Sequence, residues 1–391
     1  MSRLEYIAPC HFGLEAVLKR ELAGLGMEVT AVDDGRVTFA GNEETAAEAN
    51  LNLRTAERVL LKAGEFTAKS FDELFEETGK IPWEEILPEN ARFWVAKAFS
   101  VRSALFSPSD IQSVMKKAIV ERMKLRYHKN WFDESGPSYP MRVSVKKDVV
   151  TIGLDTSGTA LHKRGYRVSP VIAPISETLA ASLIALTPWH PDRILADPFC
   201  GSGTIPIEAA MIAANMAPGL KRSFLAETWS TVIPEEAWKR ARRKAEAQII
   251  RHPAGTDIQG YDIDARAVRF ARDNAAAAGV GELIHFQKRD VKDFHHPKKY
   301  GFIITNPPYG ERLEEREALP ELYRSVGEMY GNLDAWSMYL ISSYADTEKY
   351  IGKKADKKRK VYNGMLQTYV YQFSGPKPPR RKPGENGGKR Q

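Results

Sequence analysis

Hydrophobic and polar positions in the first 65 residues follow two periodicities, one typical of strands and one typical of helices. Leu4 to Ala8 alternates as a half-buried strand does. From Leu14 to Leu25 the apolar residues recur every three or four positions, as on one face of a helix. Two short strands joined at Asp33-Asp34-Gly35, a second helix and a strand at Val59-Leu60-Leu61 complete the order β-α-β-β-α-β. This order predicts a ferredoxin-like α+β domain over residues 1–65.

A second group of strands around one long helix covers residues 66–167. Phe93 to Val101 is predicted to be a strand. Ser107-Pro108-Ser109 predicts the start of an amphipathic helix that runs to about Arg126, because serine caps helices and proline suits their first turn. Two further strands, at 141–145 and 149–154, lead into the basic run at 161–167. We expect a second small α/β domain here.

The rest of the chain alternates apolar strands with helices, as an open α/β sheet does. A helix is expected over 174–186, and strands at 194–196, 258–262, 285–290, 302–305 and 338–342. Lys353 to Lys360 is expected to form a basic turn, and Gln367 to Phe373 a closing strand. The tail at 376–391 has no apolar residue to bury, so we expect it to be disordered. The third domain is therefore placed at 168–375.

Composition limits the class of protein. The chain of 391 residues is long enough for two or three domains, and its 43% hydrophobic and 27% charged residues are typical of a globular protein. No apolar run approaches the roughly 20 residues that a membrane span needs. The two cysteines, Cys10 and Cys200, form neither a disulfide framework nor a metal site. We expect a cytoplasmic protein without a metal or a membrane partner.

The net charge of +7 is unevenly distributed along the chain. Residues 1–91 contain 9 Lys and Arg against 18 Asp and Glu, whereas residues 92–168 contain 15 against 6. The predicted helix up to Arg126 carries a face with Lys116, Lys117 and Lys124, and the run after it contains Lys163, Arg164 and Arg167. Such a concentration of positive charge is typical of proteins that bind a polyanion. A solvated basic face without a partner is the alternative.

Two stretches carry the candidate chemistry. Ile194 to Thr204 predicts a buried strand that ends in Asp197 and is followed by a turn at Gly201 and Gly203 and then by a helix. Glycines bring backbone close to a ligand, and the helix start aims free N–H groups at it. About a hundred residues later, Phe302 to Thr305 is followed by Asn306-Pro307-Pro308-Tyr309 at another strand end. Ligands of open α/β sheets bind at this edge.

Asp-Pro-Phe-Cys-Gly-Ser-Gly-Thr and Asn-Pro-Pro-Tyr together resemble the class I S-adenosylmethionine-dependent methyltransferases that modify exocyclic amino groups of nucleobases. The resemblance implies a Rossmann-like fold with a seven-stranded sheet, and S-adenosylmethionine as cofactor. It implies that Asn306, Pro307, Pro308 and Tyr309 form the catalytic loop. The cofactor residues it implies are Asp197, Pro198, Gly201, Gly203, Thr204, Asp262, Asp290 and Asn306.

Several of these residues have a second interpretation. Asp262 follows a strand and is expected to bind the cofactor ribose, whereas Asp264 is more simply a helix cap. Asp290 is expected to accept from the adenine amino group, but it could be a turn residue. Cys200 raises the alternative of a cytosine-C5 mechanism, although it lies in the cofactor loop. His11 and Cys10 lie near a strand end and are interpreted as structural.

The segment from 66 to 167 resembles a THUMP domain, a module of RNA-modifying enzymes. Leu-Asp-Thr-Ser-Gly at 154–158 and Leu-His-Lys-Arg-Gly-Tyr-Arg at 161–167 carry this resemblance, which implies RNA binding. The insert that begins Ala-Asn-Met-Ala-Pro-Gly at 214–219 resembles that of RlmL-type large-subunit ribosomal RNA methyltransferases. It postpones the strand that ends in Asp262.

The exocyclic amine of a base is a poor nucleophile, because its lone pair is delocalised into the ring. Carbonyl groups of Asn306 and Pro307 can accept its hydrogens, and Tyr309 can stack on a flipped base. The resemblances favour guanine-N2 of 23S ribosomal RNA, protein-free or in early assembly. The alternatives are a transfer-RNA guanine-N2 methyltransferase, a DNA adenine-N6 methyltransferase and a non-catalytic RNA-binding assembly factor.

Overall fold

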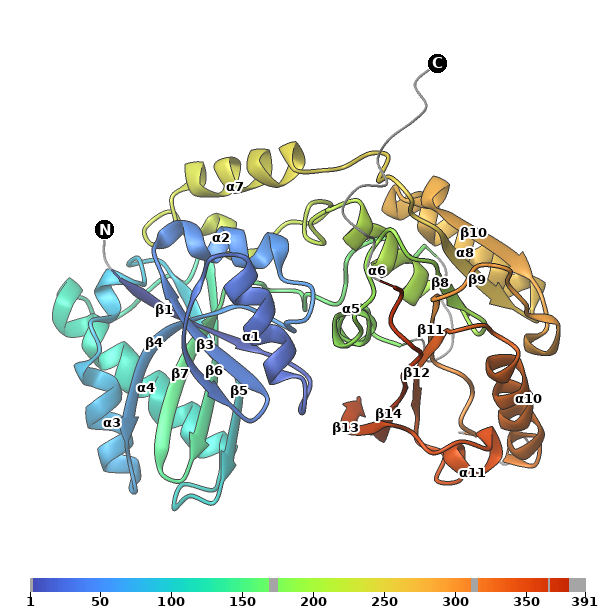
Figure 1. Cartoon of the computed structure of the whole chain (residues 1–391). Coiled ribbons are helices and arrows are strands. Elements are labelled where there is room, and N and C mark those ends of the chain that lie inside the picture. Colours follow the sequence, from blue (N-terminus) through green and yellow to red (C-terminus); the bar gives the residue numbers. More distant parts are fainter. Residues whose placement is uncertain (1–2, 169–174, 311–315, 365, 380–391) are drawn as a thin grey trace. The chain divides into compact units, whose positions relative to one another are not determined.

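The computed structural model describes residues 3–168, 175–310, 316–364 and 366–379. Its internal contacts divide the chain into two compact units, which are described separately (Figure 1). Unit 1 contains Met1–Arg167, Ser176–Ser182 and Ala214–Arg251; unit 2 contains Val168–Ile175, Leu183–Ala213 and His252–Gln391. The predicted helix start at Pro174, and most of the tail predicted to be disordered (380–391), lie outside the described residues.

The first part of unit 1 has the predicted ferredoxin-like order. Its elements are β1 (Leu4–Pro9), α1 (Glu15–Gly24), β2 (Glu28–Asp33), β3 (Arg36–Gly41), α2 (Glu43–Asn52) and β4 (Leu60–Thr67). Asn42 caps α2 and accepts the backbone N–H groups of Glu44 and Thr45 at 3.1 and 3.3 Å. Helix α1 ends as the chain reaches Gly26, which has a positive φ of 77°.

The second part of unit 1 continues the same sheet. It contains α3 (Phe71–Lys80), β5 (Arg92–Val101), α4 (Pro108–Tyr127), β6 (Ser138–Lys146) and β7 (Val149–Asp155). Strand β4 pairs with β1 on one side and with β7 on the other, which gives the order β2-β3-β1-β4-β7-β6-β5. The two predicted modules therefore share one seven-stranded sheet and one hydrophobic core.

The insertion at Ala214–Arg251 packs within unit 1. Trp229 is fully buried, stacks on Tyr139 of β6 with ring centroids 4.5 Å apart, and donates its indole N–H to the carbonyl of Ser138 at 2.9 Å. Helix α7 (Glu235–Ala247) contributes Trp238, which stacks on Phe224 at 5.4 Å. This aromatic burial is far more than a solvated loop would provide.

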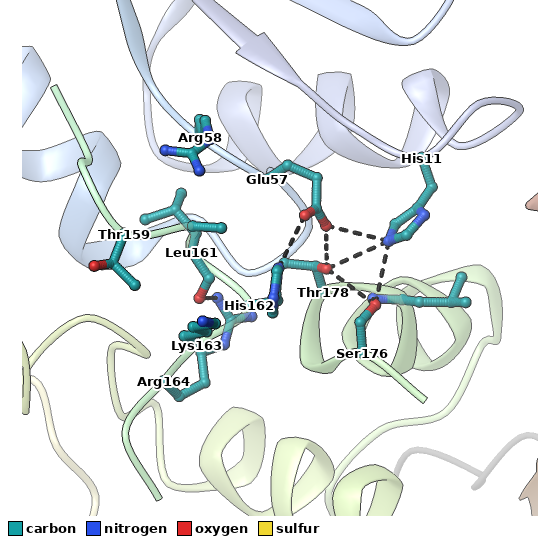
Figure 2. A network of polar contacts seen from close by, with 12 residues as sticks. His11, Glu57, Arg58, Thr159, Leu161, His162, Lys163, Arg164, Ser176 and Thr178 are labelled. Atoms are coloured by element: carbon teal, nitrogen blue, oxygen red, sulfur yellow. Dashed lines mark hydrogen bonds and ion pairs between the residues drawn. The ribbon is translucent and has the colours of Figure 1, made fainter. Parts of the chain in front are cut away.

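A half-buried polar network joins four segments of unit 1 that are far apart in the sequence (Figure 2). Glu57 lies 3.1 Å from His11 Nε2 and 3.1 Å from His162 Nδ1, and Thr178 donates to it. Burial alone would raise the pKa of Glu57, but its bonds to His11, His162 and Thr178 hold that pKa below its usual range. Glu57 thus connects His11, which follows β1, to His162 and to Thr178 of α5 (Glu177–Leu186).

Unit 2 has the Rossmann-like fold expected of a class I methyltransferase, with seven strands in the order β10-β9-β8-β11-β12-β14-β13. The strands are β8 (Leu195–Asp197), β9 (Ile258–Asp262), β10 (Ile284–Lys288), β11 (Phe302–Thr305), β12 (Ser337–Ser342), β13 (Lys357–Asn363) and β14 (Leu366–Phe373). The first five are parallel, and β14 runs antiparallel to β12. Helices α6 (Thr204–Ala213), α8 (Ala265–Ala278), α10 (Leu319–Gly331) and α11 (Thr347–Ile351) connect them.

The prediction of a basic turn over Lys353–Lys360 was wrong for its second half. Residues from Lys357 onward form the edge strand β13, which pairs with β14. The lysine ammonium of Lys358 lies over the rings of Tyr369 and Tyr371, at 4.4 and 4.7 Å from their centroids. Cation–π interactions with Tyr369 and Tyr371 on β14 therefore stabilise the charge of Lys358. Lysines on an edge strand also discourage pairing with other chains.

Candidate active site

Four polar side chains gather at the carboxyl edge of the sheet of unit 2. Asp197 ends β8, Asp262 ends β9, Asp290 follows β10 and Asn306 follows β11. These strands are parallel neighbours, so their carboxyl ends meet at one edge (Figure 1). The structure brings together the cofactor and catalytic positions that were expected from separate parts of the sequence.

The glycine turn between β8 and α6 has two glycines with different tasks. Both have positive φ angles, 51° at Gly201 and 83° at Gly203. A Cβ on Gly201 would meet no atom within 4 Å, and its backbone N–H donates to Asp262 at 3.0 Å. A Cβ on Gly203 would lie 3.0 Å from Ala271 of α8 and from Phe286 of β10. Gly201 therefore borders open space suited to a ligand, whereas Gly203 permits close packing.

Asp197 lies under this turn. It is 1% exposed, and one carboxylate oxygen accepts the Thr305 hydroxyl at 2.7 Å and the Phe199 N–H at 3.1 Å. Burial raises the pKa of Asp197 to about 7, and the nearby charge of Asp262 acts in the same direction. The side chain of Asp197 thus connects β8 to β11 at the carboxyl edge of the sheet, where the cofactor is expected to bind. Nothing in the residue pattern of β11 had marked Thr305 as its partner.

Asp262 is positioned by backbone N–H groups. Its two oxygens accept from Gly201 at 3.0 Å and from Asp264 at 2.9 Å, which leaves each oxygen a lone pair for a further donor. Asp264 caps α8 and accepts the N–H of Arg266 at 2.8 Å, as its alternative interpretation proposed. Burial raises the pKa of Asp262.

A cavity of about 230 Å³ adjoins these acids and tests whether the site fits S-adenosylmethionine. Pro198, Phe199, Asp290 and Val291 are among its lining residues. Ile263 also lines it and is 64% exposed, although it directly follows the buried strand β9. An apolar side chain left in solvent beside a carboxylate is suited to cover one face of an adenine ring. The residues present fit the adenosine part of the cofactor.

Asp290 and Thr204 have local structural roles as well. One oxygen of Asp290 accepts the N–H of Lys292 at 3.0 Å and thereby caps a short 3-10 turn. Its other oxygen accepts no hydrogen bond from the residues that the structure describes, and Asp290 is among the residues that line the cavity. Thr204 begins α6 and is buried.

Cys200 does not have the properties of a nucleophile. Its side chain is buried, and burial raises the pKa of its thiol well above the ordinary value, with Asp197 and Asp262 adding to the effect. A cysteine attacks as the thiolate, and this environment suppresses the thiolate. The structure therefore argues against the cytosine-C5 alternative.

Asn306 presents an unused acceptor. Its Oδ1 atom is buried and has no hydrogen-bond partner among the described residues. A buried carbonyl without a partner costs free energy, on the order of 1–3 kcal/mol. Such groups are retained where a ligand satisfies them. The carbonyl of Pro307 likewise accepts no hydrogen bond within the described part of the chain.

Side chains from α10 and β13 form hydrogen bonds with Pro308 and Tyr309 in the rest of the loop. The Tyr323 hydroxyl on α10 donates to the carbonyl of Pro308 at 3.2 Å and lies 2.6 Å from the hydroxyl of Ser342 on β12. Asn363, at the end of β13, donates to the hydroxyl of Tyr309 at 3.0 Å. Sequence reasoning missed Tyr323, Ser342 and Asn363, because each reaches the loop only through the fold.

A second cavity, of about 590 Å³, opens beside Tyr309. Arg316, Leu319, Tyr344 and Leu366 also line it. Gly310 closes the loop with a φ of 74°, and a Cβ there would lie 2.9 Å from both Arg316 and Leu319. This volume can hold a nucleobase, and Tyr309 and Tyr344 supply aromatic surface for it.

The basic residues proposed for RNA binding are already engaged within unit 1. Lys116 pairs with Glu134 at 3.4 Å, Lys124 pairs with Glu121 at 2.9 Å, and Lys117 lies over the ring of Phe75. Arg167 pairs with Glu177 at 2.7 Å. At Lys163 the bond is made by the backbone N–H, which donates to the carbonyl of Ala160, and not by the ammonium.

Arg164 is 3% exposed and donates to the backbone carbonyls of Leu161 and Arg54. This buried guanidinium organises the segment around it, and the expectation of a phosphate contact at Arg164 does not agree with its burial. The lysines of α4 remain accessible for phosphate contacts, because exposed ion pairs of this kind are weak.

The described residues contain neither a membrane-spanning helix nor a cluster of metal ligands. No helix among them is long and apolar enough to cross a membrane. No group of three or more His, Cys, Asp or Glu in that part of the chain is placed to hold a metal ion.

Comparison with known proteins places each region of the chain. Residues 164–372 match the RMKL-like methyltransferase domain, 5–60 the RlmL ferredoxin-like domain and 68–155 the THUMP domain. YpsC of Bacillus subtilis (strain 168), named "Putative RNA methyltransferase", is 46% identical over 99% of this chain and 100% of its own length.

Two further comparisons concern the activity. The ribosomal RNA large subunit methyltransferase K/L of Syntrophotalea carbinolica is 35% identical over 95% of this chain, which spans 53% of that protein. The crystal structure of SMU.472, a "putative methyltransferase complexed with SAH", superposes with a TM-score of 0.90 at 41% identity and covers 97% of this chain and all of that one. The chain belongs to the RMKL-like family of S-adenosylmethionine-dependent RNA methyltransferases, with a ferredoxin-like and a THUMP domain ahead of the methyltransferase domain.

Proposed function

We propose that this chain methylates the N2 amino group of guanine in large-subunit ribosomal RNA. The observation that carries the reaction is the buried, unpartnered Oδ1 of Asn306 at the carboxyl edge of the sheet. The choice of RNA is supported by the THUMP domain and by the ribosomal RNA methyltransferase K/L that resembles the whole chain. A cytoplasmic location is consistent with such a substrate.

S-adenosylmethionine, when bound, supplies an electrophilic methyl group. The protein must then hold an amine with its lone pair directed at that methyl group. Asn306 Oδ1 and the Pro307 carbonyl can accept the two amine hydrogens, and both are free to do so in the described structure. Positive charge appears on the amine during transfer, so these carbonyl dipoles stabilise the transition state more than the ground state.

The adjacent cavity would hold the base itself. Tyr309 offers a ring for stacking, and Asn363 fixes its hydroxyl at 3.0 Å. A base in a helix cannot reach this position, so it must leave the stack first. The released proton passes to solvent through the open cavity, because no described carboxylate or histidine lines that cavity.

The loop is tested by Asn306→Ala. We expect the variant to bind S-adenosylmethionine and RNA nearly as the native protein does but to lose at least about tenfold in kcat, since one hydrogen bond to a developing charge is removed. Asn332→Ala, at the exposed end of α10, is the matched control and should keep native turnover. Native turnover in Asn306→Ala would refute the proposed role.

The substrate is tested by tritiated methyl transfer to protein-free 23S RNA, early assembly particles, transfer RNA and duplex DNA. We expect label in 23S RNA, recovered as N2-methylguanine after digestion. Label confined to transfer RNA, or recovered as N6-methyladenine from DNA, would overturn the substrate while leaving the methyltransferase reaction intact.

A further inference from the structure

The face of the unit 1 sheet that lies opposite the helices carries a feature that the methyltransferase site does not use. Helices α1, α2 and α4 pack on the face that carries Tyr6, Phe39, Met141 and Ile152. The other face contains a cavity of about 240 Å³, lined from β1, β3, β4, β5, β6 and β7.

The sheet is curled around this cavity. In a flat sheet, β3 and β6 would be separated by four strand spacings, about 19 Å. The guanidinium of Arg36 on β3 nevertheless donates to the hydroxyl of Ser144 on β6 at 3.1 Å. Register shifts in β4, between Lys62 and Gly64, and in β5 give the sheet additional twist.

The irregularity in β5 determines which side chains reach the cavity. Phe93 and Val95 point into the core, and strict alternation would send residues 97 and 99 there as well. The register shift between Val95 and Lys97 reverses this, so that Lys97 pairs with Arg142 and Phe99 pairs with Ser144. Phe99 is consequently 47% exposed, and a large apolar ring is held in solvent by the backbone itself.

The lining of the cavity combines apolar, aromatic and positively charged side chains. Ile7 and Leu60 give it apolar surface, and Phe99 provides an aromatic wall. Arg36, Lys97 and Arg142 supply positive charge, against Asp34 as the single carboxylate among the lining residues.

The three cations differ in how far they are engaged. Arg36 pairs with Asp33 at 3.3 Å and Arg142 with Asp155 at 3.2 Å. Lys97, by contrast, makes no ion pair with any carboxylate in the described part of the chain. An unpaired cation two residues from an exposed aromatic ring can hold a phosphate while the ring stacks on its base.

We infer that this concave sheet face binds an unpaired segment of the RNA substrate, with a base stacked on Phe99 and its phosphate at Lys97. Bases within a duplex already have both faces stacked, so an exposed ring selects unpaired nucleotides. The inference rests on the proposed function for the choice of RNA. It adds a contact surface on the opposite side of the sheet from α4.

The test compares two double variants of equal chemistry. Lys97→Glu with Phe99→Ala removes the proposed site. Lys69→Glu with Phe71→Ala alters an exposed lysine and phenylalanine with the same two-residue spacing, at the junction of β4 and α3. Both change the net charge by the same amount and remove one exposed phenyl ring, so only the location differs. Thermal melting should show both variants folded.

Binding is measured by fluorescence anisotropy at one fixed salt concentration, with a labelled single-stranded oligoribonucleotide and with a blunt-ended RNA hairpin. We expect the first variant to bind the single strand about tenfold more weakly or worse, while its hairpin affinity falls less. The control variant should stay within about twofold of the native protein for both probes.

Equal losses in both variants, no loss in the first, or an equal loss on the hairpin would overturn the inference. So would a native protein that does not bind the single strand, which would leave the face to a protein partner. Asn306→Ala should bind the oligoribonucleotide as the native protein does. A wrong assignment of the reaction would therefore be visible in methyl transfer and not in this assay.

Discussion

The carboxyl group of Asp197 illustrates what burial does to a single residue. Free aspartic acid has a pKa of 3.8, and burial raises the pKa of Asp197 to about 7 in the folded protein. Between these values the folded state holds a proton that the unfolded state releases. Stability must therefore fall as the pH rises through this window.

Asp197→Asn should remove this dependence. The native protein is expected to lose stability between pH 5 and pH 8 relative to the variant, by at most about 3 kcal/mol, because the two pH units from 5 to about 7 contribute roughly 1.4 kcal/mol each. Asparagine keeps an acceptor for Thr305 and Phe199, so the geometry at the end of β8 should persist. Scanning calorimetry of both proteins without cofactor at pH 5, 6.5 and 8 measures the difference. Parallel pH profiles would show that Asp197 is already ionised at low pH.

Residue identity alone does not separate the two glycines, or the two aspartates, at the carboxyl edge of the unit 2 sheet. Gly201 and Gly203 are two positions apart in the sequence, yet one borders open space and the other meets Ala271 and Phe286. Asp262 and Asp264 divide in the same way, into a side chain held by the glycine turn and a helix cap. In each pair the neighbours in space decide the task.

At the scale of elements, the position of the Asn306–Tyr309 loop depends on contacts with residues that lie later in the chain. Helix α10 supplies Tyr323 and strand β12 supplies Ser342, which together fix the carbonyl of Pro308. Strand β13 reaches Tyr309 through Asn363. Prolines restrict the backbone of this loop, but such contacts are needed to fix its position relative to the carboxyl edge of the unit 2 sheet.

Tyr323→Phe should lower kcat by up to about tenfold, because the loss of one buried hydrogen bond costs about 0.5–1.5 kcal/mol and loosens Pro308. Binding of S-adenosylmethionine, measured by calorimetry, should change little. Tyr330→Phe is the matched control on the same helix. The buried hydroxyl of Tyr330 donates to the backbone carbonyls of Trp336 and Phe373, away from the loop. Equal effects on kcat in the two variants would mean that only general stability was lost.

At the scale of the whole molecule, the insertion has to be considered with unit 1. Trp229 and Trp238 are buried against unit 1, although they lie between two segments of unit 2 in the sequence. Removal of residues 1–167 would therefore take away Tyr139, on which Trp229 stacks, and helix α2, against which α7 packs. A simple N-terminal truncation is a poor test of the methyltransferase domain by itself.

A fragment that also lacks the insertion is a better test of the methyltransferase domain. The N–H of Ile250 donates to the carbonyl of Ala214 at 2.8 Å, so the insertion leaves and returns at one point. We expect a fragment from residue 168 onward to aggregate, whereas the same fragment with 215–249 replaced by a short Gly-Ser linker should be soluble. Light scattering and calorimetry with S-adenosylmethionine compare the two. A soluble, cofactor-binding fragment that retains the insertion would contradict this account.

The sequence by itself determined most elements and the order of the polar residues at the sheet edge. Periodicity reports which side of an element is buried, and strand-end acids, glycines and Asn306–Tyr309 mark a ligand edge because parallel strands end together. The ferredoxin-like, THUMP and Rossmann-like folds followed from these patterns and from family resemblance, and were confirmed. The boundaries of the domains, and the roles of individual residues at the site, stay predictions.

Only the tertiary structure decided which strands pair and which side chains are buried against one another. Strand β4 pairs with both β1 and β7, and this joins two predicted modules into one sheet. Arg164 belongs to a basic run in the sequence, but backbone carbonyls enclose it. A one-residue shift in β5 turns Phe99 from the core to solvent. Local patterns record how polar each position is, whereas register, pairing and burial depend on partners far away in the chain.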